Sequence, residues 1–166
     1  MILCVIMASI SLDRFDRRIL VALQDNARMS NVALARRVNL SASQCARRLR
    51  ALERRGVIRG FNARLDLASV GIGVTAFVTV TMEKHGQVQA EAFHDAVQDV
   101  DEVLECQLVT GDGDYLLRVV ATDLTAFSAL MTDRLMRLPG VANLRSSIAL
   151  TPIKESARLP IETGLE

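Results

Sequence analysis

The segment at residues 39–59 constrains the fold of this chain more than any other, because it carries both the start and the stop signal of one short helix. Ser41 is followed three residues later by Gln44, the capping-box pattern that begins a helix. Gly56 lies where a glycine commonly ends one. Between these signals, three residues share one apolar face: Cys45, Leu49 and Leu52. The segment therefore predicts a helix over residues 41–55.

The opposite face of this helix is polar and rich in arginine. Advancing about 100° per residue brings five side chains onto it: Ser43, Gln44, Arg47, Ala51 and Arg54. Three more arginines flank it: Arg48, Arg50 and Arg55. Such a helix suits the major groove of DNA, where these side chains can donate to base edges and phosphates. The alternative is a solvated basic helix on an ordinary domain, which is the commoner meaning of a charge run.

Charge is divided unevenly along the 166-residue chain, although the net charge is only +1. Residues 1–65 contain 13 arginines, no lysine and four acids, a net charge of +9. Residues 66–166 contain seven basic and 15 acidic residues, a net charge of −8. This asymmetry indicates a nucleic-acid-binding half and a second half with a different task.

Cysteine usage and the N-terminus exclude several classes of protein. Cys4, Cys45 and Cys106 lie far apart, which is neither a disulfide framework nor a zinc-binding pattern. Residues 1–10 are mostly apolar but too few to span a bilayer, and they lack the basic start and cleavage site of a signal peptide. We expect a cytoplasmic protein without a membrane partner, in which residues 1–10 are an extension and Met7 is a possible true start.

Two further helices are predicted before the arginine-rich one, giving a DNA-binding domain over residues 11–60. The first has a regular apolar stripe formed by Leu12, Phe15, Ile19 and Leu23. Ser30 caps a second, short helix, and Asn39-Leu40 makes a turn of the length found in helix-turn-helix motifs. Three short helices, the last one basic, match the tri-helical DNA-binding plan. Residues 57–65 are predicted to be extended, as a wing or as part of a linker strand at 61–72.

The acidic half predicts an α+β domain over residues 73–152. Its expected elements are a strand at 74–82, a helix at 87–100, strands at 102–109 and 115–121, a helix capped by Asp123 and stopped by Pro139-Gly140, and a strand at 141–151. The order β-α-β-β-α-β is that of the ferredoxin-like sandwich. Residues 153–166 are predicted to be a tail or a closing segment.

One face of such a sheet is left open by the two helices. In the strand at 74–82, alternate residues fall on that face: Thr75, Phe77, Thr79 and Thr81. An uncovered face carrying a large aromatic side chain suggests packing against a second copy of the chain.

Several short motifs occur in a fixed order over residues 11–160. In the basic half they are Leu12-Asp13, Asp16, Ile19-Leu20, Asn26-Ala27-Arg28, Leu34-Ala35, Val38, Leu40-Ser41, Arg48-Leu49, Leu52-Glu53 and Gly56-Val57-Ile58. In the acidic half they are Val109-Thr110-Gly111-Asp112, Asp114-Tyr115-Leu116-Leu117, Leu138-Pro139-Gly140-Val141 and Lys154. In this order and spacing the sequence resembles the Lrp/AsnC family, the leucine-responsive and asparagine-responsive regulators of bacteria and archaea.

The resemblance implies a winged or plain helix-turn-helix joined to an effector-binding αβ sandwich. It also implies homodimers formed through the sandwich sheets, often assembled into octamers, with an amino acid bound between sandwiches at the loop 111–114. Two positions depart from the family pattern. Ala42 and Gln44 stand where prolines are common, and Ser146 stands where the last strand often has threonine. The first departure bears on base preference and the second on the effector.

We expect double-stranded DNA to contact the basic half. Base edges are expected at Ser43, Gln44 and Arg47, because arginine pairs well with guanine and glutamine with adenine. Phosphate contact or simple solvation is the alternative for these three. Phosphate contacts, which tolerate inexact placement, are expected at Arg36, Arg37, Arg54, Arg55 and Arg59. The expected interface also includes Ser41, Arg48 and Arg50.

An effector site is expected at Thr110, Gly111, Asp112, Gly113, Asp114 and Ser146. The alternative for the loop is a plain hairpin turn, since Gly-Asp sequences make turns anyway. A zwitterionic amino acid would place its ammonium on an aspartate and its carboxylate on glycine N–H groups. No catalytic residue, cofactor or metal is expected, because neither His85 nor His94 has neighbours at metal-binding or triad spacing.

The leading interpretation is a sequence-specific transcription regulator tuned by a small molecule. Two alternatives share its architecture. One is a DNA-wrapping protein with little sequence preference. The other is a porphyrin-pathway decarboxylase-like enzyme, which we would expect to lack the arginine-rich helix.

Overall fold

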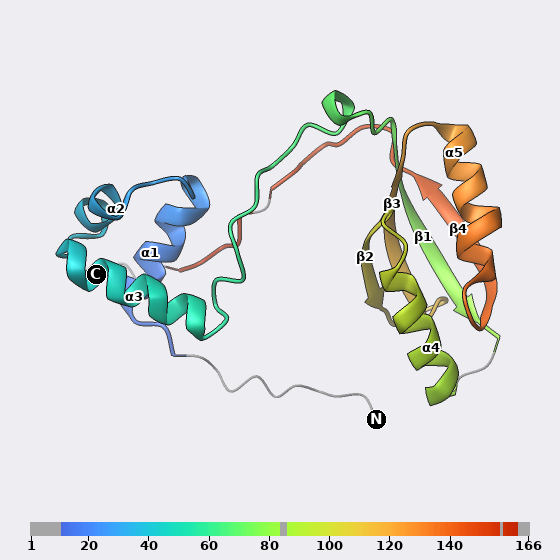
Figure 1. The fold of residues 1–166 in the computed structure, drawn as a ribbon, viewed down its shortest axis with the longest axis horizontal. Coiled ribbons are helices and arrows are strands. Elements are labelled where there is room, and N and C mark those ends of the chain that lie inside the picture. Colours follow the sequence, from blue (N-terminus) through green and yellow to red (C-terminus); the bar gives the residue numbers. More distant parts are fainter. Residues whose placement is uncertain (1–10, 84–85, 157, 163–166) are drawn as a thin grey trace. The chain divides into compact units, whose positions relative to one another are not determined.

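The structure is a computed structural model that describes residues 11–83, 86–156 and 158–162 (Figure 1). The chain forms two compact units. One consists of the residues up to Ala63 together with those from Lys154 onward, and the other runs from Arg64 to Ile153. The expected extension at residues 1–10 lies outside the described residues.

The first unit contains three helices: α1 (Arg14–Asp25), α2 (Asn31–Val38) and α3 (Ala42–Arg54). Each helix begins after a residue whose side chain accepts hydrogen bonds from first-turn N–H groups, and these caps are Asp13, Ser30 and Ser41. Asn39 has a φ of 58°, a left-handed conformation that asparagine tolerates, and it forms the turn between α2 and α3. The predicted helix-turn-helix is therefore confirmed.

The three helices enclose one apolar core. Its fully buried side chains come from every helix: Ile19, Leu34, Val38, Cys45 and Leu52. Burial raises the pKa of the Cys45 thiol, as expected for a small core residue. Gly56 has a φ of +68° and donates its N–H to the carbonyl of Glu53, so α3 ends where the glycine predicted. Residues 57–67 form neither a helix nor a strand, so the predicted extended segment has no strand partner within one chain.

The residues at the C-terminus belong to this first unit rather than to the sandwich. The backbone of Leu159 exchanges two hydrogen bonds with the side-chain amide of Gln24 on α1, at 2.5 and 3.3 Å. Arg158 forms an ion pair with Asp25 at 3.1 Å, and Ile161 packs against the helical core. We call residues 158–162 the C-terminal strap. The described residues of the strap thus pack against the helical unit.

The second unit is a four-stranded antiparallel sheet with two helical segments. Its regular elements are β1 (Val74–Met82), α4 (Gln87–Gln98), β2 (Val103–Leu108), β3 (Tyr115–Ala121), α5 (Leu124–Ala129) and β4 (Val141–Ile148). The strand order is β2-β3-β1-β4 (Figure 1). This order places β3 between β1 and β2, as in the ferredoxin-like sandwich, and it confirms the α+β class.

Both helical segments cover the same face of the sheet. Val78, Val80 and Leu117 are fully buried on that face, where they join Phe93 of α4 and Phe127 of α5 in one core. The other face of β1 carries Thr75, Phe77, Thr79 and Thr81, of which Phe77 is 43% exposed. The predicted alternation of β1 is therefore confirmed.

The last helical segment differs from its prediction. A continuous helix was expected from Asp123 to Leu138, but α5 changes at Leu130–Arg134 into a π-helical turn and then at Leu135–Arg137 into a 3₁₀ turn. The inward-facing residues are nonetheless buried or half-buried, including Leu130 and Leu135. Apolar spacing predicts which residues face the core. It does not show that one turn of the helix contains an extra residue, as a π-helical turn does.

Candidate DNA-binding helix and ligand loop

Helix α3 presents its polar face to solvent. Cys45 and Leu52 on its back are fully buried. Of the five residues expected on its front, Ser43, Gln44, Arg47 and Arg54 are exposed and Ala51 is half-buried. The cap residue Ser41 and the flanking Arg50 are exposed as well. The phase of the helix is therefore the one that the sequence predicts, and the core fixes it.

Two of the predicted front residues also build the helix cap. The N–H of Gln44 donates to Ser41 Oγ, and the N–H of Ser41 donates to Gln44 Oε1, both at 3.3 Å. Ser41 Oγ also donates to the same Gln44 oxygen at 3.0 Å. A bidentate pair with adenine needs that amide oxygen, so Gln44 could form it only by giving up half of the capping box. Ser43 Oγ also lies within hydrogen-bond distance of Ser41 Oγ, at 3.2 Å, whereas Arg47 makes no hydrogen bond with the cap among the described residues.

Arg48 faces helix α1 instead of solvent. Its Nη1 lies 2.7 Å from Asp13 Oδ2 and 2.8 Å from Asp16 Oδ1, and its guanidinium lies over the Phe15 ring at 5.4 Å. Burial opposes ionisation of Asp13, but hydrogen bonds from the Asp16 N–H and Arg48 outweigh it, so the pKa of Asp13 lies below its ordinary value. Arg48 thus ties the third helix to the first.

Arg55 strengthens the same connection. It donates to the carbonyl of Ser11 at 2.9 Å and lies 4.0 Å from Asp16. Sequence reasoning assigned Arg55 to phosphates and missed this tie. The signal was Asp16, an acid within an apolar helical stripe, because a buried carboxylate requires a cationic partner.

The other arginines of the predicted DNA interface fall into two groups. Arg37 forms an ion pair with Asp25, which also binds Arg158 of the C-terminal strap. A second group is exposed and makes no ion pair with any described residue: Arg36, Arg47, Arg50, Arg54 and Arg59. These five have the side chains best placed to meet phosphates.

In the second unit, the loop between β2 and β3 is fixed onto β1. The N–H of Asp114 donates to the carbonyl of Val80 at 2.9 Å, and Asp114 Oδ2 accepts from the N–H of Met82 at 2.8 Å. A Cβ on Gly113 would lie 2.2 Å from Thr79 Cγ2, so only glycine allows this close approach. Asp114 therefore anchors the loop, whereas Asp112 is exposed.

Ser146 is not brought to this loop within one chain. It lies in β4 opposite Val78, so β1 separates it from β3 and from the loop that precedes β3. Its side chain belongs to the helix-covered face, like that of Val78, whereas Thr79 belongs to the open face. The predicted effector residues thus form one compact group, Thr110 to Asp114, and one distant member.

Tyr115, directly after the loop, connects it to helix α4. Its ring is 4% exposed and lies 4.6 Å from the Phe93 ring, and its hydroxyl lies 2.9 Å from His94 Nε2. Burial, with smaller contributions from Cys106 and Asp114, raises the pKa of Tyr115. His94 is thus an exposed histidine whose Nε2 is hydrogen-bonded to the Tyr115 hydroxyl.

The described residues contain neither a metal-binding cluster nor a helix that could span a membrane. Among them, no group of three or more His, Cys, Asp and Glu side chains could hold a metal ion. Over the same residues, none of the helices is both long enough and apolar enough to cross a membrane.

A basic helix-turn-helix unit joined to a ferredoxin-like sandwich defines a DNA-binding protein with a separate regulatory domain. Two family models match the chain: a winged helix-turn-helix DNA-binding domain over residues 12–59 and the Lrp/AsnC ligand-binding domain over residues 75–159. The chain belongs to the Lrp/AsnC family of transcription regulators. This membership removes the enzyme alternative, because the relatives are regulators with a DNA-binding domain.

Individual relatives match over nearly their whole length. The leucine-responsive regulatory protein of Escherichia coli (strain K12) is 42% identical over 152 residues, which cover 92% of this chain and 93% of that protein. A transcriptional regulator from Neisseria meningitidis, solved as a complex with L-Met, is 41% identical with a TM-score of 0.85 over 90% of this chain and 97% of that one. An AsnC family regulator from Agrobacterium tumefaciens is 36% identical with a TM-score of 0.84, over 90% of this chain and 97% of that one.

Proposed function

We propose that this regulator inserts α3 into the major groove, with Ser43 and Arg47 at base edges and Arg36, Arg50, Arg54 and Arg59 at phosphates. The observation that carries the proposal is the group of exposed arginines, none of which is paired with an acid among the described residues. Their charge is free to neutralise phosphates and release counterions. Arg48 and Arg55 contribute by holding the helix in place.

Salt titration tests this interface. Each phosphate contact adds about −0.9 to the slope of log K against log salt concentration, so several contacts per DNA-binding unit predict a steep slope. A slope near zero would contradict the proposal. Comparing the promoter of the adjacent gene with random DNA at equal salt separates two possibilities, since a DNA-wrapping protein would bind both equally.

We further propose that the effector is an α-amino acid bound at residues 110–114. The relative from Neisseria meningitidis was solved with L-Met, and the Lrp/AsnC ligand-binding model covers this loop. Asp112 is the exposed carboxylate for the ammonium group. Asp114 has a role in fixing the loop onto Met82, and Ser146 could join the site only from another subunit.

A thermal-shift screen of the twenty amino acids tests the effector site. We expect at least one amino acid to raise the melting temperature, because a ligand that binds only the folded state stabilises it. Asp112→Ala should lower that response, whereas DNA binding without effector should change little. An undiminished response in Asp112→Ala would place the effector elsewhere. Asp114→Ala is less informative, because it also removes the hydrogen bond to Met82.

We also propose that the protein works as a homodimer or octamer. The open sheet face carries Phe77, which is 43% exposed, and burying such apolar area gains about 25 cal/mol per Å². Because we propose that the protein binds DNA, we also propose that it is located in the cytoplasm. Light scattering of the full-length protein at micromolar concentration would contradict this assembly if it showed a monomer.

A further inference from the structure

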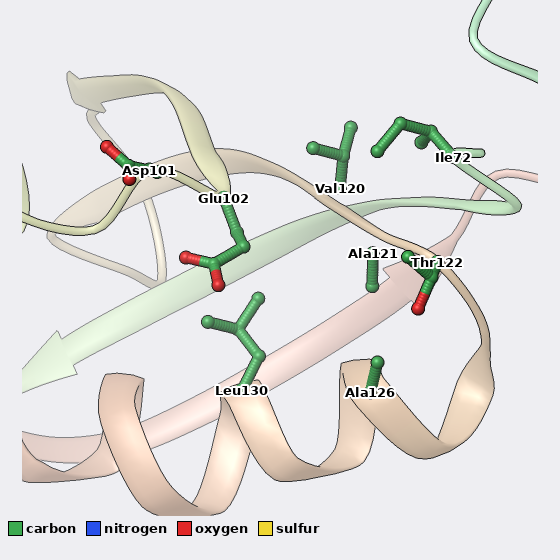
Figure 2. Close-up of a pocket in the computed structure, with 8 residues that line it drawn as sticks. All are labelled: Ile72, Asp101, Glu102, Val120, Ala121, Thr122, Ala126 and Leu130. Atoms are coloured by element: carbon green, nitrogen blue, oxygen red, sulfur yellow. The ribbon is translucent and has the colours of Figure 1, made fainter. Parts of the chain in front are cut away.

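A cavity opens at the end of the sandwich opposite the ligand loop. Strand β3 runs from the loop at Tyr115 to this cavity at Ala121. The cavity has a volume of about 400 Å³, within the range of small-molecule sites. Its walls come from the chain before β1, the turn between α4 and β2, the end of β3, and α5, and the lining residues are Ile72, Asp101, Glu102, Val120, Ala121, Thr122, Ala126 and Leu130 (Figure 2).

Most of the lining is apolar and well supported. Val120, Ala121 and Leu130 are buried, and Ile72 and Ala126 are half-buried at the rim. Gly73 donates its N–H to the carbonyls of Ala121 and Thr122, both at 3.1 Å, which fixes the neighbouring Ile72. The cavity therefore offers a fixed apolar surface for a small branched hydrocarbon group.

Two carboxylates provide the polar edge, and no lining residue is cationic. The carboxylate of Glu102 is directed toward Leu130 across the cavity, and Asp101 lies farther out (Figure 2). Asp101 is exposed and makes no hydrogen bond or ion pair with another described residue. A bound cation would therefore find a carboxylate that has no competing partner in this part of the chain.

Arg134 holds this edge from outside the cavity. Its Nη1 lies 2.6 Å from Glu102 Oε2, and its Nη2 donates to the carbonyl of Asp99 at 3.0 Å. The π-helical turn Leu130–Arg134 carries both the apolar wall at Leu130 and this arginine. π-Helical turns occur often at functional sites, because the extra residue redirects the side chains that follow. Arg134 binds Oε2 of Glu102, and Oε1 makes no hydrogen bond with another described residue.

We propose that this cavity is a second binding site, for a small primary alkylamine. Its ammonium would lie on the carboxylates of Asp101 and Glu102, and its alkyl group against Ala121, Ala126 and Leu130, which share the helix-covered face of the sheet. A free α-amino acid is disfavoured, because its carboxylate would face Asp101 and Glu102, and the neighbouring cation, Arg134, is already held by Glu102 and the carbonyl of Asp99. The site therefore differs from the loop at residues 110–114 in both position and ligand class.

The test uses full-length protein with labelled Ile, Leu, Val and Ala methyl groups, titrated with isopentylamine and followed by NMR. We expect saturable shifts of the Ala121, Ala126 and Leu130 methyl signals, with a Kd of about 1 mM for so small a ligand. Isopentanol should bind at least about tenfold more weakly because it lacks the charge, and leucine should not move these signals. Absence of saturable shifts, or equal binding of the alcohol, would overturn the proposal.

Three variants assign the binding to this cavity. Asp101→Asn should weaken amine binding, and Ala126→Leu should block it by filling the space, while Asp95→Asn on the exposed side of α4 should bind like the parent protein. If Ala126→Leu does not fold, Asp101→Asn still tests the site, because Asp101 is exposed and its substitution leaves the core unchanged. Undiminished amine binding by Asp101→Asn, or weakened binding by Asp95→Asn, would show that the amine responds to surface charge elsewhere.

Discussion

Arg47 and Arg48 are neighbours in the sequence, but their side chains have different tasks. One helical step of about 100° leaves Arg47 in solvent and turns Arg48 onto Asp13 and Asp16. Periodicity predicts the buried and exposed faces of α3 well. It does not predict the flank, because the partner of a flanking arginine lies on another helix, about 30 residues away in the sequence.

Exchanging each arginine for alanine separates the two tasks. Arg48→Ala leaves the buried Asp16 with only the longer contact to Arg55, so it should lower the free energy of unfolding of the helical unit by about 1–3 kcal/mol. Arg47→Ala should leave stability within about 0.5 kcal/mol of the parent. It should instead weaken specific DNA binding by about 1–3 kcal/mol and relax preference at one base pair.

Urea denaturation and DNA titration measure these two effects. The interpretation fails if Arg48→Ala is as stable as the parent protein. If Arg47→Ala loses equal affinity for every sequence, Arg47 is a phosphate contact rather than a base contact.

At the scale of elements, the helices and strands that depend on neighbouring residues in the sequence were predicted correctly. Caps and apolar spacing placed α1, α2 and α3, and strict alternation gave the bounds of β1 as found. The π-helical turn and the C-terminal strap were not predicted as such. A π turn keeps the same residues buried as a regular helix, and the strap is held by partners more than 130 residues away, so neither leaves a periodic signal.

The strap should stabilise the helical unit and not the sandwich. Ile161 packs against the helical core, whereas Ile153 is 93% exposed, so the pair provides a test and its matched control. Ile161→Ala should speed amide hydrogen exchange in α1 relative to β1, because buried apolar contacts limit local opening. Ile153→Ala should leave both unchanged. Equal acceleration in α1 and β1, or none, would contradict a role confined to the helical unit.

At the scale of the whole molecule, the uneven charge predicted two units with different tasks, and the family assignment agrees. The position of Ser146 could not be predicted in the same way. Strand β4 shows no clear alternation, and its register against β1 shifts at Thr81/Met82. A one-residue shift exchanges the faces of a strand, so the sequence alone did not show on which face Ser146 lies.

The last prediction concerns assembly through the open sheet face. Phe77 lies on this face between Arg118 of β3 and Ser147 of β4, and it is 43% exposed. Phe77→Lys replaces an apolar contact by a charge beside Arg118, so it should shift the full-length protein toward monomers. DNA affinity should then fall by about 100-fold or more, since two linked DNA-binding units bind with a high effective concentration and one does not.

Val88→Lys is the matched control, because Val88 is 75% exposed on α4, a helix that covers the other face of the sheet. Light scattering gives the assembly state, and a DNA titration at fixed salt gives the affinity. An oligomer that survives Phe77→Lys would mean that the subunits meet through another surface. A monomer that keeps full DNA affinity would mean that a single helical unit suffices, and the link between assembly and DNA binding would be refuted.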